Sequence, residues 1–192
     1  MKKTSMVLIM LVGSIAFASS LSIPWYVDTA PVGTNLPPEE SGGLALIYLK
    51  STVDRVLTCE IAYYNSAGQK VGPFAPAVNT FTIQPMSALG FRPVADDPAA
   101  GLTSPWGHTG TNKGQEGIQA MKVPNRPFSP DTSTAIPNSG GIIDVRKNGS
   151  ITISWTGPEA APTDIQGSMM SWNYNKATGV LVSFSHLLPP GK

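Results

Sequence analysis

A stretch in which apolar residues recur at every second position constrains the fold of this chain more than any other feature of its sequence. From Val56 to Tyr64, one face carries Leu57, Cys59, Ile61 and Tyr63, and the other carries Thr58, Glu60, Ala62 and Tyr64. Successive side chains of a strand point to opposite faces of its sheet, so this stretch predicts a strand with one face in the core. No segment shows a convincing apolar period of 3.6 residues, so no helix is predicted.

The segments on either side extend this pattern from Gly43 to Thr82. Leu44 to Leu49 is almost continuously apolar, which favours a strand covered on both faces. Asn65 to Gln69 is rich in residues that tolerate turn dihedrals, and Val71 and Phe81 follow at strand spacing. We interpret Gly43 to Thr82 as two or three neighbouring strands of one antiparallel sheet, with a first turn near Asn65 to Gly68.

Two consecutive hairpins are predicted in the last third of the chain. The first joins residues 142–147 to 150–156 through Asn148-Gly149, a pair typical of the type I′ turn. The second joins residues 168–174 to 180–187, with Trp172 and Tyr174 opposite Val180, Val182 and Phe184. Trp155 and Trp172 fall on apolar faces, so both are predicted to be core residues.

Residues 85–93 add another short strand, and the total is roughly eight short strands punctuated by Gly and Pro, a pattern typical of two packed sheets. We therefore predict an all-β fold, an antiparallel β-sandwich of the Ig-like or jelly-roll-like kind, forming one domain over residues 43–192. A small β-barrel is the alternative.

The N-terminal residues have the features of a targeting segment. Lys2 and Lys3 precede an apolar run from Met6 to Ala18, which ends in small residues suited to a cleavage site. The alternative is a transmembrane anchor, but this run is shorter than the roughly 20 apolar residues that span a bilayer. We predict a signal peptide over residues 1–18, cleaved between Ala18 and Ser19, and export to the periplasm, the cell surface or the extracellular space.

After the expected cleavage site, residues 19–42 are rich in proline and are predicted to form an extended arm along the domain. Ile23, Trp25 and Val27 lie at strand spacing in this arm. Pro24 restricts such a strand to the edge of a sheet, because proline cannot donate a ladder hydrogen bond.

A long loop separates the two regular parts of the chain. Residues 93–141 contain seven Pro and seven Gly in 49 positions. Long irregular connections inside a compact domain are uncommon and are often functional. The loop is therefore the first place to look for a site, and its candidate residues are Asp96, Asp97, Trp106, His108, Lys113, Glu116, Arg126 and Asp131.

Composition and motif searches exclude several classes of partner and cofactor. The chain has 13 Lys and Arg against 12 Asp and Glu, which gives no electrostatic reason to expect nucleic acid. Cys59 is the single cysteine and lies on an apolar face, so it is predicted to be buried and unreactive. His108 and His186 have no metal-ligand spacing, and residues 107–114 lack the Gly-Lys-Ser/Thr ending of a phosphate loop. No cofactor and no metal site are predicted.

Nothing in the sequence specifies a reaction, so we expect a non-enzymatic protein, and three hypotheses follow. The first is a binding module for a protein or glycan partner, with contact residues Trp25, Tyr26, Asp96, Asp97, Trp106 and His108. The second is a structural subunit of an envelope or extracellular assembly, joined through the N-terminal arm and exposed strand edges. The third is a hydrolase whose acid and base come from Asp96, Asp97, His108 and Glu116.

Overall fold

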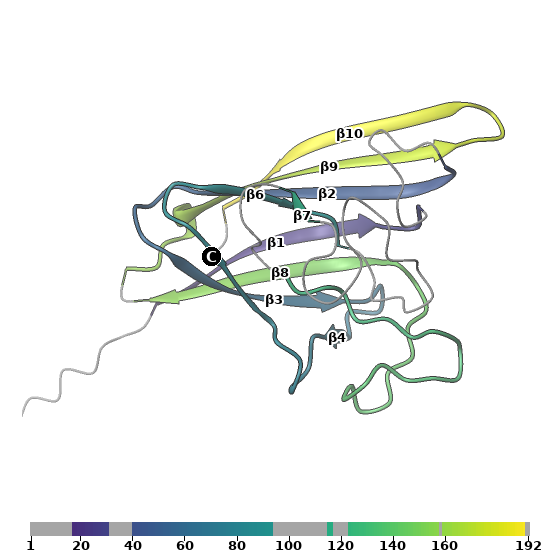
Figure 1. Ribbon diagram of the computed structural model, residues 1–192, viewed down its shortest axis with the longest axis horizontal. Helices are drawn as coiled ribbons and strands as arrows, with labels where there is room; N and C mark the ends of the chain where they lie inside the picture. The colour runs from purple at the N-terminus through teal and green to yellow at the C-terminus, as the bar shows by residue number, and fades with distance from the viewer. Residues whose placement is uncertain (1–16, 31–39, 94–114, 117–122, 158, 191–192) are drawn as a thin grey trace, which may run out of the picture.

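The computed structural model describes residues 17–30, 40–93, 115–116, 123–157 and 159–190, whose strands form two antiparallel sheets packed face to face (Figure 1). In sheet A the order is β1 (Phe17–Val27), β8 (Asn148–Gly157), β3 (Leu57–Tyr64) and β4 (Lys70–Gly72), and β5 (Thr80–Ile83) also pairs with β3. In sheet B the order is β10 (Val180–Leu188), β9 (Ile165–Asn175), β2 (Gly42–Ser51), β6 (Ala88–Phe91) and β7 (Gln115–Glu116). A short 3₁₀ helix, η2 (Pro162–Asp164), precedes β9. The predicted all-β sandwich is confirmed, and the described strands do not close into a barrel.

The core lies between the inner faces of the two sheets. The four apolar residues of β3 are buried, as the alternation predicts, and Trp155 of β8 is buried beside them. Sheet B contributes Ile47, Leu49 and Phe91 from β2 and β6. Burial raises the pKa of Cys59 to about 12, so its thiol stays protonated and unreactive at neutral pH. The core positions predicted for Cys59 and Trp155 are confirmed.

The prediction that all strands between Gly43 and Thr82 share one sheet is wrong. β3, β4 and β5 belong to sheet A, and a turn at residues 65–68 connects β3 to β4 as predicted. β2 instead pairs with β6 and β9 in sheet B. The chain therefore crosses from one layer to the other after Ser51, where Thr52 donates a backbone hydrogen bond to Asp164 at 2.9 Å.

The predicted hairpin at Asn148-Gly149 is also wrong, because residues 142–147 form no strand and β8 begins at Asn148. β8 pairs with β1 on one side and with β3 on the other. Gly149 has a φ of +149°, and a Cβ at this position would lie 2.0 Å from the carbonyl oxygen of Tyr64. The glycine is required by the close approach of two strands rather than by a turn.

The first part of the expected arm is an integral edge strand of the sandwich. β1 pairs with β8 from Phe17 to Val27, and a register shift falls between Ile23 and Tyr26, around Pro24. This irregularity turns Tyr26 into the core and leaves Trp25 exposed. Pro24 thus occupies an edge strand at a bulge, the position in a sheet that tolerates proline.

The second predicted hairpin is present as β9 and β10, but its register differs by one residue. Ser183 lies opposite Trp172, and Leu181 lies opposite Tyr174. A shift of one residue moves side chains to the other face, so Trp172 is half-buried on the outer face of sheet B rather than in the core. Val182, on the other face of the hairpin, lies opposite Asn173.

Candidate functional site

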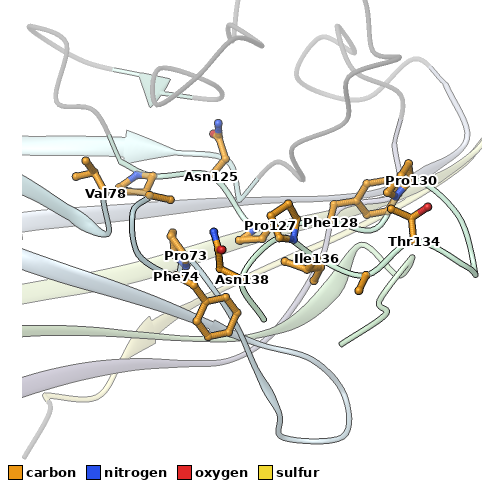
Figure 2. Close-up of a pocket in the computed structure, with 14 residues that line it drawn as sticks. Pro73, Phe74, Val78, Asn125, Pro127, Phe128, Pro130, Thr134, Ile136 and Asn138 are labelled. Atoms are coloured by element: carbon orange, nitrogen blue, oxygen red, sulfur yellow. The ribbon is translucent and has the colours of Figure 1, made fainter. Parts of the chain in front are cut away.

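A pocket of about 650 Å³ opens where two segments distant in sequence meet beside β4 (Figure 2). One segment, residues 73–78, connects β4 to β5, and the other, residues 124–138, precedes β8. Five of the 14 lining residues are prolines, and none is Asp, Glu, Lys, Arg or His. Its apolar lining includes the side chains of Phe74, Val78, Phe128 and Ile136.

The first segment is short and constrained by its neighbours. Ala77 donates a backbone hydrogen bond to Phe74 at 2.8 Å, which closes a tight turn. Gly72, with a φ of +118°, allows the second segment to approach, because a Cβ there would lie 2.9 Å from the Cγ atom of Pro127. The close approach of Pro127 to Gly72 thus holds the two segments of the pocket together.

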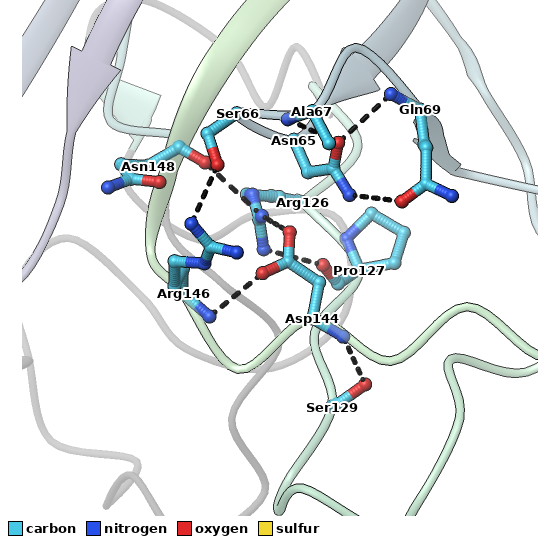
Figure 3. A network of polar contacts seen from close by, with 10 residues as sticks. All are labelled: Asn65, Ser66, Ala67, Gln69, Arg126, Pro127, Ser129, Asp144, Arg146 and Asn148. Atoms are coloured by element: carbon cyan, nitrogen blue, oxygen red, sulfur yellow. Dashed lines mark hydrogen bonds and ion pairs between the residues drawn. The ribbon is translucent and has the colours of Figure 1, made fainter.

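The second segment is held by an ion pair buried beneath it (Figure 3). The Nη2 atom of Arg126 lies 2.5 Å from Oδ2 of Asp144, and the two side chains are 0% and 3% exposed. The same guanidinium donates to the carbonyl oxygens of Pro127 at 3.0 Å and Asn148 at 3.2 Å. Ser129 also exchanges two hydrogen bonds with the backbone of Asp144, at 3.0 and 2.9 Å. Arg126 thus connects the pocket wall to the first residue of β8.

Two tyrosines of the core complete this support. The hydroxyl of Tyr63 donates to the carbonyl oxygen of Pro124 at 2.8 Å, where the pocket segment begins. Tyr26 packs edge to face on Tyr63, with ring centroids 6.3 Å apart. Burial raises the pKa of Tyr26, and the positive charge of Arg126 acts in the opposite direction. Burial also raises the pKa of Tyr63, so both phenols stay protonated, and Tyr63 supports the start of the pocket segment through Pro124.

The rim of the pocket is shaped by Asp131. Its Oδ1 atom accepts backbone hydrogen bonds from Ser133 at 2.8 Å and Thr134 at 2.7 Å, and it also accepts the Ser133 hydroxyl. These hydrogen bonds lower the pKa of Asp131 to about 2, although the group is exposed. The Thr134 hydroxyl donates to the same carboxylate. The charged carboxylate of Asp131 therefore stabilises the conformation of residues 131–134.

The contact residues predicted from the sequence and described in the structure, Trp25 and Tyr26, do not line this pocket. Tyr26 is in the core, and Trp25 is exposed on β1. Ala18 and Ser19, the expected cleavage junction, lie on β1 opposite Thr156 and Trp155.

The other candidates cannot be placed from the described residues. Asp96, Asp97, Trp106, His108 and Lys113 lie outside the described residues, as does the side chain of Glu116.

Sequence reasoning named Arg126 and Asp131 among the loop residues but missed the pocket itself. The signal in the sequence was the proline density of residues 124–137 combined with Phe128. The partners of these prolines, Phe74 and Val78, are some 50 positions away along the chain. Within the described part of the chain, no group of three or more His, Cys, Asp or Glu residues is placed to hold a metal ion. No helix among the described residues is long and apolar enough to cross a membrane.

Comparison with known proteins adds little to this picture. No protein-family model matches the chain, and no curated protein matches its sequence. The solved structure of Thermotoga maritima 1070 aligns over 91% of this chain and 97% of its own, with a TM-score of 0.39 and 10% sequence identity. A likeness at this level supports no conclusion about fold or function.

Proposed function

We propose that this protein is an exported, non-enzymatic binding module that receives an uncharged, apolar segment of a partner protein in the pocket between residues 73–78 and 124–138. The observation that carries the proposal is the chemistry of the pocket's lining, which is rich in proline and phenylalanine and contains no charged side chain. Export is part of the proposal because of the signal-peptide pattern over residues 1–18.

The size and rigidity of the pocket suit a ligand. Pockets that bind small molecules or side-chain clusters range over roughly 300–1,000 Å³, and this one is about 650 Å³. Proline-rich walls have little conformational freedom to lose when a ligand binds. The buried Arg126–Asp144 pair further restricts the wall formed by residues 124–138. A rigid apolar pocket of this kind favours binding through burial of apolar surface.

The same lining favours a peptide segment over a glycan. A glycan presents many hydroxyl groups, each of which needs a hydrogen-bond partner once it is buried. The polar side chains of the lining are Asn125, Thr134 and Asn138, and the Thr134 hydroxyl already donates to Asp131. Extended proline-rich segments instead bind grooves lined by aromatic rings, and this pocket contains Phe74 and Phe128. We therefore assign the pocket to an apolar segment of a protein.

The test compares binding to an array of uncharged decapeptides rich in Pro, Leu and Phe with binding to an array of neutral oligosaccharides. We expect selected peptides to bind and the oligosaccharides to give no signal. The key variant is Val78→Asp, because Val78 lines the pocket and is 59% exposed, so the substitution leaves the core intact. Val56→Asp is the matched control, because Val56 is 50% exposed and lies outside the pocket.

Val78→Asp introduces a charge that would be desolvated by an apolar ligand, and we expect it to weaken peptide binding by roughly tenfold or more. Val56→Asp should bind the same peptides as the wild type. Equal binding by both variants, or binding of oligosaccharides alone, would overturn the proposal.

A further inference from the structure

The edge of sheet B that is formed by β10 differs from the protected edges of most soluble β proteins. β10 is nine residues long, and in the described part of the chain it pairs with β9 alone. Its sequence, Val-Leu-Val-Ser-Phe-Ser-His-Leu-Leu, contains no Lys, Arg, Asp, Glu or Pro. Natural edge strands are usually short or carry charges, prolines or bulges that block pairing with another chain. β10 has none of these features, and its register with β9 is regular throughout.

Both faces of β10 are exposed over most of its length. Among the described strands, sheet A ends at β1, and none of them lies beyond that edge to cover the inner face of β10 (Figure 1). Val180, Val182 and Phe184 on this face are 54–57% exposed. On the outer face, Leu181 is 43% and Leu187 83% exposed. Within the part of the chain that the structure describes, β10 therefore presents one edge of unpaired backbone groups and five large apolar side chains to solvent.

The order of residues along β10 is nearly symmetric about Phe184. Antiparallel pairing of the strand with a second copy of itself, centred on Phe184, places Ser183 opposite Ser185 of the second copy. The same register places Leu181 opposite Leu187 and Val180 opposite Leu188, and Val182 is the one apolar residue of β10 that meets a polar residue, His186. A two-fold interface requires such self-complementarity, because the same patch contributes both sides.

We propose that two copies of this chain pair through β10 in an antiparallel register centred on Phe184, joining their B sheets into one continuous sheet. The pairing satisfies the N–H and C=O groups that every second residue of β10 points toward the free edge on each copy. Covering these groups and the five exposed side chains removes on the order of 500–700 Å² from each copy, which reaches the roughly 1,000 Å² in total expected of a specific interface. The interface lies on β10, and no residue of β10 lines the pocket. The dimer can therefore be tested independently of the proposed binding function.

Cysteine cross-linking tests the register directly. In the proposed pairing, residue 184 lies opposite itself at a Cα–Cα distance of about 4.5–5.5 Å, within the range of a disulfide. Residue 182 lies about 13 Å from its own copy, which is too far. Phe184→Cys should therefore form a covalent dimer under mild oxidation, and Val182→Cys should not. The two positions are a matched pair, because they share one face and are 56% and 57% exposed. Cys59 does not compete, because it is buried.

Light scattering coupled to size-exclusion chromatography gives the second readout, on the full chain without introduced cysteines. We expect twice the mass of one chain, and Phe184→Lys should raise the dissociation constant by roughly tenfold or more, because two like charges then face each other. Circular dichroism checks that Phe184→Lys retains the fold. A wild-type monomer at the highest soluble concentration, or equal cross-linking at positions 182 and 184, would overturn the proposal.

Discussion

Replacing Arg126 with methionine should destabilise the protein strongly, because the substitution leaves a buried carboxylate without its partner. The Asp144 side chain is 3% exposed and would keep its hydrogen bond from the backbone amide of Arg146, at 3.0 Å. The carbonyl oxygens of Pro127 and Asn148 would lose the donors that Arg126 supplies. Removal of one partner from a buried ion pair costs about 3–5 kcal/mol. A loss of this size is a large fraction of the roughly 5–15 kcal/mol that stabilises a typical domain.

The exposed ion pair between Lys176 and Glu40 provides the matched control. These side chains are 59% and 48% exposed, so solvent already screens both charges. Lys176→Met should therefore change the free energy of unfolding by no more than about 1 kcal/mol. The two substitutions remove a cation from one ion pair each and differ in the burial of the charge that remains.

Urea unfolding monitored by tryptophan fluorescence measures both changes. The double variant Arg126→Met with Asp144→Leu should recover part of the stability lost in Arg126→Met, because it no longer buries an unpaired charge. A free energy of unfolding for Arg126→Met within about 1 kcal/mol of that for Lys176→Met would refute the reasoning. Such a result would mean that the Asp144 carboxylate is hydrated or protonated at little cost.

Two further predictions concern the backbone and the titration of the core. Gly149→Ala should cost at least about 2 kcal/mol, because its Cβ would lie 2.0 Å from the Tyr64 carbonyl oxygen. Gly157→Ala, with no atom within 4 Å of the new Cβ, should stay within about 0.5 kcal/mol in the same urea titration. Burial raises the pKa of Asp28 to about 6 from 3.8 despite the adjacent Arg92, so the folded state binds this proton more tightly than the unfolded chain. The free energy of unfolding should therefore fall as pH rises from about 4 to about 6. Asp28→Asn should abolish this dependence on pH. An unchanged dependence in the variant would contradict the assignment to Asp28.

The elements predicted well from the sequence are those whose pattern is local. The alternation from Leu57 to Tyr64 is sufficient to identify β3 and its buried face, because period and burial coincide over its eight residues. The β9–β10 hairpin was recognisable from its polar turn, which Asn175 closes by accepting a backbone hydrogen bond from Ala177 at 3.0 Å. Its register was predicted wrongly, because the prediction matched apolar with apolar residues, whereas the observed register places Ser183 opposite Trp172 and Asn173 opposite Val182.

The elements predicted poorly depend on partners that are distant in sequence. Asn148-Gly149 has the composition of a hairpin turn. The glycine is instead required because the carbonyl oxygen of Tyr64, on the neighbouring strand β3, leaves no room for a Cβ. β2 was assigned to the wrong sheet because a continuous apolar run indicates burial without indicating a neighbour.

The pocket shows the same limit. It depends on Arg126 meeting Asp144 and on Pro127 approaching Gly72, and no local pattern indicates either approach. The loop that the sequence predicted to carry a site, residues 93–141, does contain the pocket segment 124–138, and residues 94–114 of that loop lie outside the described residues.

Methyl NMR of the labelled protein, titrated with a peptide selected from the uncharged array, tests the central claim most directly. The account predicts that the largest chemical-shift changes fall on the methyl groups of Ala77, Val78, Ala135 and Ile136, which line the pocket. The methyl groups of Val180 and Leu181 on β10 should be unaffected. Changes confined to β10, or spread evenly over the sandwich, would contradict the assignment of the pocket as the binding site.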